Sequence, residues 1–336
     1  MKAARITLAV IALFRVSPAS AAQEPGSFER HSFTNAAGTR DYMLYVPSTA
    51  APLRPLVLYI PGALQTADQA ATDTRWNELA EEEEGFFVLY PEPDLEEGGF
   101  FHYMDEADQH RGRGVPAIIA GMTEHITSQW QIDPARIYVG GASNGAAMAN
   151  VMIATYPDLY AAVFAHSGCA YKGQCGAIIG SSVSAEESAA AIVAEMDGRA
   201  RVIPFIVFQG TMDPAVPPYL SERTVESWLR ADDVFDDGLD DGSIALEPSA
   251  VEHGMVPNGR TYDVRRYVDA GGDALGEYWT VDGMRHAYSG GAPGTIPGVA
   301  VDLESERKVS ASGTDPAGPD ATRAAYSFFM AHPRTD

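Results

Sequence analysis

The sequence predicts an α/β protein with a mostly parallel central sheet and helices on both faces. Short apolar runs rich in β-branched and aromatic residues alternate along the chain with longer segments of helical periodicity. Strands that alternate with helices form parallel sheets, because each helix returns the chain to the edge where the next strand begins. The 336 residues are enough for a large core, and 46% hydrophobic residues is typical of a globular protein.

The expected strands follow in chain order. Alternating patterns predict two strands joined through the turn at Asn35–Thr39. Continuous apolar runs are typical of strands buried on both faces. The expected strands are Phe28–Thr34, Tyr42–Val46, Leu56–Ile60, Phe86–Tyr90, Ile137–Val139, Ala161–Ala165, Pro204–Phe208, Tyr262–Val268 and Gly276–Val281.

Helical periodicity occupies the segments between these strands. The expected helices are Thr72–Glu83, Pro116–Gln129, Ala146–Tyr156, Ala185–Glu195, Pro217–Arg230 and a closing helix at Pro319–His332, with Asp320 near its N-terminus. No internal repeat and no linker to a second domain is evident. We therefore expect residues 23–336 to form a single domain.

The first 22 residues resemble an export signal. Lys2 and Arg5 precede the apolar run Ile6–Phe14, and the small residues Ala19–Ala22 suit a cleavage site. The apolar run is too short to span a membrane, which needs about 20 residues. The sequence thus predicts a secreted or periplasmic protein without a membrane anchor.

The formal charge of −23 disfavours nucleic acid as a partner, because phosphate repels an acidic surface. The acid-rich segment Asp232–Gly242 lacks the spacing of calcium ligands found in an EF-hand loop and is expected to be a solvated loop.

Cys169 and Cys175 are the only cysteines. An exported chain predicts a small-loop disulfide between them, with two free thiols as the alternative. No metal site is predicted.

The most informative segment is the run Ile137–Ala146, in which a strand pattern ends in Gly141-Ala142-Ser143-Asn144-Gly145 and a helix pattern follows. A nucleophilic serine of this kind needs a strand, a sharp turn and a helix. The glycines allow the turn, and the helix N-terminus favours developing negative charge beside Ser143. The alternative is an ordinary Gly-rich turn with a serine N-cap.

A serine hydroxyl needs a base, an orienting acid and oxyanion donors. Asp213 and His286 each follow a predicted strand, in the chain order Ser, Asp, His. We expect Ser143 to be the nucleophile, His286 the general base and then acid, and Asp213 the group that holds the imidazole tautomer. Asp282 is a rival acid. His166 is a rival base, although a structural hydrogen-bonding role suits it better.

Two backbone N–H groups are expected to form the oxyanion hole. One belongs to Asn144, directly after the nucleophile, and the other to Ala63 in the loop Pro61–Gln65, with Leu64 as the alternative. Apolar side chains near these loops are candidates for contacts with a substrate. We expect such contacts from Leu64, Tyr103, Met284 and Tyr288, while Phe100 and Phe101 suit the core equally well.

The chain resembles the polyhydroxybutyrate depolymerase-like esterases, which are related to feruloyl and acetylxylan esterases of the α/β-hydrolase fold. The stretches that carry the resemblance are short, and from first to last they span nearly the whole chain after the signal. They are Pro61–Gln65, Val88–Glu92, Arg111–Gly114, Ile132–Ser143, Tyr156–Val163, the Asp213 loop, His286–Gly291 and Gly318–Arg323. The resemblance implies the same three catalytic residues and an esterase that acts on polymeric or oligomeric esters.

Two stretches depart from the family pattern. Pro61-Gly62-Ala63 stands where the family usually has His-Gly-Cys, and Phe100–Met104 stands where it often has a Cys-Trp-rich stretch. The absence of both cysteines suggests that a family disulfide near the cleft has been lost as a unit.

The expected function is that of a secreted serine esterase, a polyesterase that works through an acyl-enzyme without metal or cofactor. The expected substrates are polyhydroxyalkanoates or related synthetic aromatic polyesters such as PET. The alternative is a feruloyl or acetylxylan esterase acting on plant polysaccharide. A non-catalytic binding protein on a hydrolase scaffold is the rival from another class. A monomer is expected.

Overall fold

Ten strands of the described chain form one mixed sheet in the order β1-β2-β4-β3-β5-β6-β7-β10-β9-β8. The computed structural model describes residues 26–49, 52–83, 85–94, 98–175, 183–293, 297–302 and 307–335. The six strands β4-β3-β5-β6-β7-β10 run parallel, and antiparallel strands extend the sheet at both edges. The strands are β1 (Ser27–Asn35), β2 (Gly38–Val46), β3 (Arg54–Ile60), β4 (Phe87–Pro91), β5 (Ile132–Ala142), β6 (Val163–His166), β7 (Phe205–Gly210), β8 (Ala250–Met255), β9 (Thr261–Val268) and β10 (Ala274–Val281).

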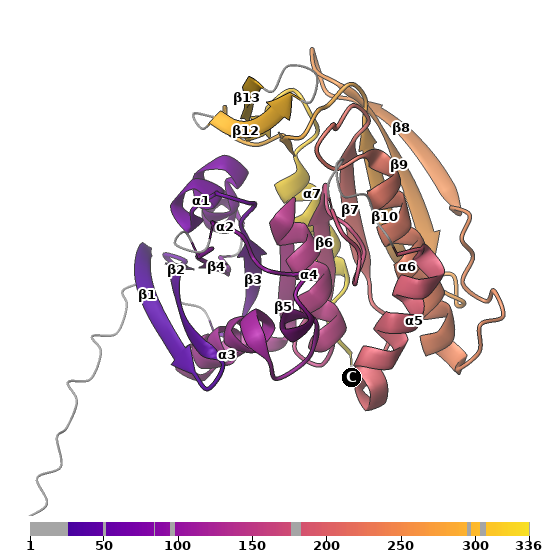
Figure 1. Ribbon diagram of the computed structural model, residues 1–336, viewed down its shortest axis with the longest axis horizontal. Coiled ribbons are helices and arrows are strands. Elements are labelled where there is room, and N and C mark those ends of the chain that lie inside the picture. Colours follow the sequence, from indigo (N-terminus) through magenta and orange to yellow (C-terminus); the bar gives the residue numbers. More distant parts are fainter. Residues whose placement is uncertain are drawn as a thin grey trace, which may run out of the picture.

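Helices cover both faces of this sheet, as the sequence predicts (Figure 1). They are α1 (Ala67–Thr74), α2 (Trp76–Glu82), α3 (Gly114–Gln129), α4 (Asn144–Thr155), α5 (Ala185–Met196), α6 (Pro218–Asp237) and α7 (Ala321–Ala331). One core lies between the sheet and α3 to α6, and a second lies between the sheet and α1, α2 and α7. Strand β3 serves both cores, because Leu56 and Leu58 point to the first and Val57 and Tyr59 to the second.

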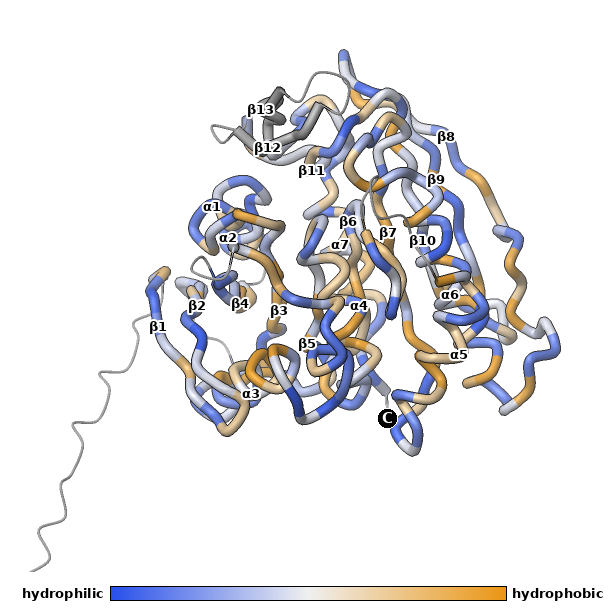
Figure 2. The backbone as a smooth tube through the Cα atoms, viewed as in Figure 1, coloured by the Kyte–Doolittle hydropathy of each residue, from blue (hydrophilic) through white to orange (hydrophobic). Residues whose placement is uncertain are grey.

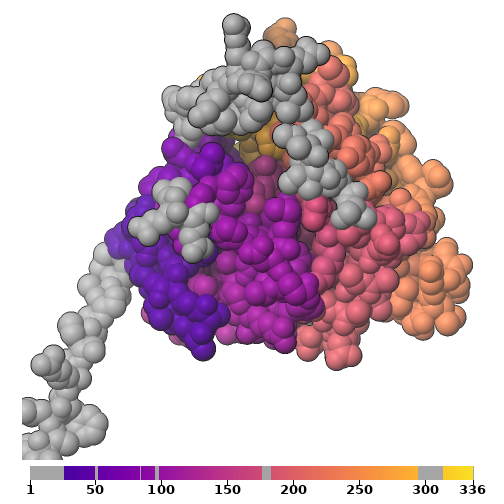
Figure 3. Space-filling view, in the orientation of Figure 1, coloured from indigo at the N-terminus to yellow at the C-terminus, as the bar shows by residue number. Residues whose placement is uncertain are grey.

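Hydrophobic residues gather in the central strands and in α4, while the outer strand β8 is mixed (Figure 2). In the space-filling view, the indigo segment that includes β1 and β2 and the orange segment that includes β8 occupy opposite sides of the visible face (Figure 3). The predicted fold class is confirmed. None of the helices in the described ranges is long and apolar enough to cross a membrane. The predicted export signal lies outside the described residues.

The segment predicted as one helix at Thr72–Glu83 consists of two. A capping box of Thr66 and Gln69 starts α1 five residues before the predicted helix, and Arg75 adopts a left-handed conformation with φ 62° between α1 and α2. Distant groups bind the carbonyls at this break. Ala292 N–H donates to Asp73 O at 2.9 Å, and Thr322 Oγ1 donates to Thr74 O at 2.5 Å. Tertiary hydrogen bonds therefore end the helix where periodicity alone would continue it.

The expectation of a solvated acidic loop at Asp232–Gly242 is wrong for its first half. The helix α6 continues to Asp237, and both Asp232 and Asp233 are buried. Asp232 Oδ1 accepts a hydrogen bond from Ile203 N–H, and burial raises the pKa of this carboxyl well above its ordinary value. Asp233 accepts from the N–H groups of Gly242 and Ile244, so it closes the loop after the helix. Backbone donors, not solvent, hold these acidic side chains.

Several small strands have no counterpart in the prediction. They are β8, the pair β11 (Tyr288–Ser289) and β14 (Thr314–Asp315), and the pair β12 (Pro297–Asp302) and β13 (Arg307–Ser312). Strand β8 is exposed along most of its length, so it lacks the buried face that makes a strand recognisable in a sequence. The predicted position of Asp320 near the start of the closing helix is confirmed, and the structure adds that its side chain accepts a hydrogen bond from Arg323 N–H and caps α7.

Candidate active site

Ser143 lies on a strained turn between β5 and α4. Its φ is 55° and its ψ −121°, a conformation that residues with a side chain rarely adopt. Ser143 N–H donates to His166 O at 2.8 Å, which ties the turn to the end of β6. The helix α4 begins at the next residue, so its free N–H groups face the region around the serine. The predicted order of strand, turn and helix is therefore present.

The two glycines of the motif are required by space. A Cβ on Gly145 would lie 2.0 Å from Ile60 O and 2.4 Å from Pro61 O. A Cβ on Gly141 would lie 2.5 Å from the carbonyl carbon of Gly145. All these atoms belong to the backbone, which cannot move aside as a flexible side chain can. The helix and the strand β3 can therefore approach each other only when these positions carry no side chain.

We expect Gly145→Ala to lower the free energy of unfolding by about 3 kcal/mol, the upper end of the usual cost of overpacking. Urea unfolding followed by circular dichroism measures this change. Gly198→Ala is the matched control, because no atom lies within 4 Å of the Cβ it would add. Equal stabilities of the two variants would contradict the close approach at the turn.

Ser143, His286 and Asp213, together called the triad below, form one chain of hydrogen bonds. His286 Nε2 lies 2.9 Å from Ser143 Oγ, and His286 Nδ1 lies 2.7 Å from Asp213 Oδ2. The three residues come from the ends of β5, β10 and β7, which meet at the same edge of the parallel sheet. Ser143 and His286 are partly exposed, and the Asp213 side chain is fully buried. A small molecule can thus reach the serine but not the carboxylate.

Asp213 is held as an anion by its neighbours. Its Oδ1 accepts from Ala215 N–H and Val216 N–H, both at 2.9 Å, while Oδ2 accepts from His286. Burial by itself raises the pKa of this carboxyl, but the hydrogen bond and charge of His286, with the two backbone donors, bring the pKa below its ordinary value. A carboxylate in this state favours the His286 tautomer that carries its proton on Nδ1.

The two rival residues occupy other positions. Asp282 is exposed and contacts the hydroxyls of Thr211 and Thr261 at 3.4 and 3.5 Å. His166 is buried, and its Nε2 accepts a hydrogen bond from Ser289 N–H at 3.0 Å. Burial lowers the pKa of His166 to about 3, so this ring is neutral at ordinary pH. The preferred structural role of His166 is confirmed.

The loop that carries the expected oxyanion donor lies against Ser143. A Cβ on Gly62 would be 3.4 Å from Ala142 O and 3.8 Å from Ser143 Cβ. Gly62 N–H donates to Gln65 Oε1, and Leu64 N–H donates to Gly99 O at 2.7 Å. The alternative donor, Leu64, is therefore already engaged. Ala63 and Asn144 remain the predicted pair, and Asn144 opens α4, where N–H groups lack a partner within the helix.

The four predicted substrate residues separate into two groups. Leu64 is 53% exposed on the oxyanion loop. Tyr103, Met284 and Tyr288 are buried in the cores, so they offer no surface to a ligand in this structure. The Tyr288 hydroxyl bonds Thr322, and its ring stacks on His166 with 4.9 Å between centroids. Tyr103, Met284 and Tyr288 therefore pack the loops around the site, because the core extends up to the loops that carry the triad.

The role of the Asn144 side chain, and two further residues near the site, were not predicted from the sequence. The Asn144 side chain pairs with the backbone of Phe101, with Nδ2 donating to Phe101 O at 2.9 Å and Oδ1 accepting from Phe101 N–H at 2.7 Å. This pairing holds the stretch Phe100–Met104 beside the nucleophile. Met212 is 62% exposed on the Asp213 loop. Gln209 is buried, and its Nε2 lies 3.3 Å from Asp213 Oδ2. Only the position of Met212 next to Asp213 was a signal in the sequence.

The predicted disulfide between Cys169 and Cys175 is confirmed. Cys175 N–H donates to the Tyr103 hydroxyl at 3.0 Å, and the Tyr171 hydroxyl donates to Gln109 O. The closed loop thus supports the segment that Asn144 holds from the other side. Its span is short, so it pins a loop and contributes little to the fold as a whole.

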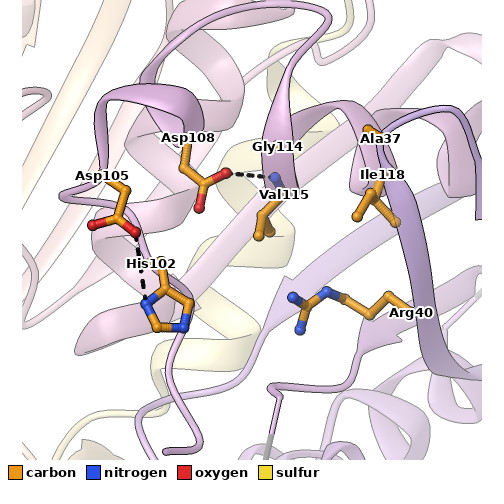
Figure 4. A pocket seen from close by; sticks show the side chains of 8 residues that line it. All are labelled: Ala37, Arg40, His102, Asp105, Asp108, Gly114, Val115 and Ile118. Carbon is orange, nitrogen blue, oxygen red and sulfur yellow. Dashed lines mark hydrogen bonds and ion pairs between the residues drawn. The ribbon is translucent and has the colours of Figure 1, made fainter. Parts of the chain in front are cut away.

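A pocket of about 220 Å³ opens beside the N-terminus of α3 (Figure 4). Its polar lining includes Arg40, His102, Asp105 and Asp108, and no member of the triad lines it. His102 Nδ1 lies 4.0 Å from Asp105, and Asp108 Oδ1 accepts from Val115 N–H at 2.6 Å. Asp108 therefore accepts a hydrogen bond from one of the backbone N–H groups at the start of α3 that have no partner within the helix.

Within the described ranges, no group of three or more His, Cys, Asp or Glu residues could hold a metal ion.

The sequence matches the model of one known protein family. The family model described as "Esterase PHB depolymerase" matches residues 40–240, which is more than half of the sequence. The chain belongs to this family. The matched range contains Ser143, Asp213 and the oxyanion loop. The resemblance predicted from the sequence motifs is confirmed.

Curated relatives of this esterase family member are ester hydrolases by name. Probable acetylxylan esterase A of Aspergillus fumigatus is 33% identical over 176 residues, 50% of this chain and 47% of that protein. Poly(3-hydroxyalkanoate) depolymerase C of Paucimonas lemoignei is 34% identical over 137 residues, 40% of this chain and 33% of that protein. The chain spans half or less of the length of these two relatives.

Solved structures support the fold of the family member. The acetyl xylan esterase from Aspergillus awamori has a TM-score of 0.62 at 21% identity, covering 77% of this chain and 94% of that one. A feruloyl esterase module from Clostridium thermocellum has a TM-score of 0.51 at 12% identity, covering 78% and 82%. At such identities the likeness concerns the fold alone, which is that of the α/β-hydrolase esterases.

Proposed function

We propose that this member of the family is a serine esterase that works through an acyl-enzyme. The observation that carries the proposal is the continuous hydrogen-bonded chain from Ser143 through His286 to the buried Asp213, with distances of 2.9 and 2.7 Å. In the proposed first step, His286 Nε2 takes the proton of Ser143 Oγ as this oxygen attacks the ester carbonyl. Asp213 holds the imidazole and stabilises the imidazolium that forms.

The remaining steps follow from the same groups. The N–H groups of Ala63 and Asn144 stabilise the negative oxygen of the tetrahedral intermediate. His286 then gives its proton to the leaving alcohol, which departs and leaves Ser143 acylated. Water enters, His286 takes a proton from it, and a second tetrahedral intermediate collapses to release the acid and restore Ser143. Every proton taken by His286 is returned, so the cycle needs no cofactor.

For the substrate we propose polyesters or their oligomers, of hydroxyalkanoate or aromatic type such as PET. Leu64 lies in the loop of the predicted oxyanion donor Ala63, Phe100 precedes the Phe101 that pairs with Asn144, and Met212 precedes Asp213; the three are 53%, 44% and 62% exposed. Exposed large apolar side chains around a polar catalytic group suit an apolar chain that contains ester bonds. The named activity of the Paucimonas lemoignei relative supports the same choice.

The second candidate is an acetyl or feruloyl esterase acting on plant polysaccharide, and the names of the acetylxylan esterase relatives favour it.

We also propose that the protein acts outside the cytoplasm. The disulfide between Cys169 and Cys175 supports this, since such bonds persist in oxidising compartments. The signal predicted at residues 1–22 points the same way.

A panel of esters tests the proposal. We expect release of hydroxybutyrate oligomers from poly(3-hydroxybutyrate) film, detected by mass spectrometry, with less release of acetate from acetylxylan or ferulate from a feruloyl sugar. Ser143→Ala is the control for spontaneous hydrolysis. Turnover of the polysaccharide esters alone would favour the second candidate. A folded protein inactive on every ester and unreactive toward a fluorophosphonate would favour a binding protein.

A further inference from the structure

Gln209 contacts the buried side of the triad. It lies in β7, just before the last residue of that strand, and its side chain is among the fully buried polar groups. Its amide Nε2 lies 3.3 Å from Asp213 Oδ2, 3.0 Å from Val216 O and 3.0 Å from Gly210 O. The Oδ2 atom is also the acceptor for His286 Nδ1–H. Gln209 and His286 therefore approach the same carboxylate oxygen.

The orientation of this amide is set by a second buried group. Ser221 Oγ, on α6, donates to Gln209 Oε1 at 2.6 Å. A hydroxyl donor next to Oε1 leaves the NH₂ end of the amide facing Asp213. The other carboxylate oxygen, Oδ1, is occupied by the N–H groups of Ala215 and Val216. Both oxygens of the carboxylate are thus surrounded by donors, so the group cannot rotate without breaking several hydrogen bonds.

We propose that Gln209 is a positioning residue, which holds the Asp213 carboxylate in the orientation that receives His286 Nδ1–H. The proposal rests on the proposed esterase function. An amide suits this task because it donates hydrogen bonds at every pH and adds no charge to a buried site. Gln209 acts only through Asp213 and does not touch the reacting atoms.

Replacing the amide by a carboxylic acid of the same shape tests the role. In Gln209→Glu, the introduced carboxyl can donate to Asp213 only while it is protonated. Burial and the adjacent carboxylate keep it protonated at low pH, and it loses its proton as the pH rises. We expect kcat/KM for p-nitrophenyl acetate to fall by about 10- to 100-fold as the pH rises, along a basic limb that the wild-type enzyme lacks.

The pH profile depends on the titratable groups around Asp213. Those described near the carboxylate are His286 and His166. His166, with its pKa of about 3, stays neutral over the range tested. A basic limb specific to Gln209→Glu therefore reports the introduced carboxyl.

Asn150→Asp is the matched control. Asn150 is also a fully buried amide, and its partners are Cys169 O and Trp228 Nε1, neither of which belongs to the triad. We expect this variant to lose stability while keeping the wild-type shape of the pH profile. A merely structural effect of burying an acid would give both variants the same profile, and that result would overturn the proposal. A wild-type profile in Gln209→Glu would overturn it as well.

Ser221→Ala tests the proposal where Gln209→Glu does not fold. Without the Ser221 hydroxyl, the Gln209 side-chain amide can rotate and exchange its oxygen and NH₂ ends. We therefore expect slower labelling of Ser143 by a fluorophosphonate, with an unchanged circular dichroism spectrum of the native state. An unchanged labelling rate would contradict the positioning role. Wild-type protein that neither turns over esters nor reacts would contradict the proposed function itself, a result that is distinct from the failure of Gln209 alone.

Discussion

Replacement of Ser143 by alanine is expected to reduce ester hydrolysis by a factor on the order of 10⁴ to 10⁶. The methyl group cannot form the acyl-enzyme, and the oxyanion donors and binding contacts account for the activity that remains. The measurement is kcat/KM for p-nitrophenyl acetate, together with covalent labelling by a fluorophosphonate. His286→Ala should have an effect of similar size, because the hydroxyl then has no base 2.9 Å away.

Ser167→Ala is a matched control for this experiment. Ser167 also follows a parallel strand and has a positive φ of 52°, but it is buried. Its replacement should leave the fluorophosphonate adduct in place. The fold of Ser143→Ala should persist, since the change removes one oxygen without altering volume elsewhere. A labelled Ser143→Ala protein, or one that retains hydrolysis above about a tenth of the wild-type rate, would place the nucleophile elsewhere.

Asp213→Asn is expected to lower kcat/KM by roughly 10⁴-fold, with more residual activity than Ser143→Ala. The amide has nearly the shape of the carboxylate but presents an NH₂ group or an uncharged oxygen to His286 Nδ1. The imidazole then loses the partner that holds its proton on Nδ1 and stabilises the imidazolium. At 2.7 Å this contact is the shortest polar contact of His286 with another described residue.

Asp282→Asn provides the comparison for that result. Asp282 lies four residues before His286 in the chain, but among the described residues its carboxylate contacts the hydroxyls of Thr211 and Thr261, at 3.4 and 3.5 Å. We expect this variant to keep near wild-type kcat/KM. Full activity in Asp213→Asn with loss of activity in Asp282→Asn would make Asp282 the orienting acid and would require the His286 loop to rearrange.

The central strands were predictable because burial on both faces favours continuous apolar runs, and their short length, flanking turn residues and β-branched or aromatic content distinguish such runs from helices. The break at Arg75 and the continuation of α6 through Asp233 were not. Each involves hydrogen bonds from distant parts of the chain, from Ala292 and Thr322 in one case and from Ile203 to Asp232 in the other. Local periodicity carries no information about partners that are remote in sequence.

The candidate site shows the same division. The proximity of Ser143, Asp213 and His286 was predictable, because each follows a strand of the parallel sheet and the three types of side chain have few substitutes for the chemistry we propose. The roles of Met284 and Tyr288 were not, because an apolar residue beside a catalytic loop has the same appearance in a sequence whether it faces a ligand or the core. Their burial decides the matter, and it is a property of packing.

By itself, the sequence determined the order of the central strands and of most helices between them, the turn around Ser143, and the choice of Ser143 and His286 with Asp213 or Asp282 as the acid. Each is encoded locally, through apolar periodicity or through glycines whose absent side chains the turn requires. Only the tertiary structure decided that Asp213 rather than Asp282 meets His286, that Leu64 N–H is occupied by Gly99, and that Gln209 lies behind the carboxylate. These contacts join residues from separate loops and strands, and their geometry exists only once the sheet has brought the strand ends together.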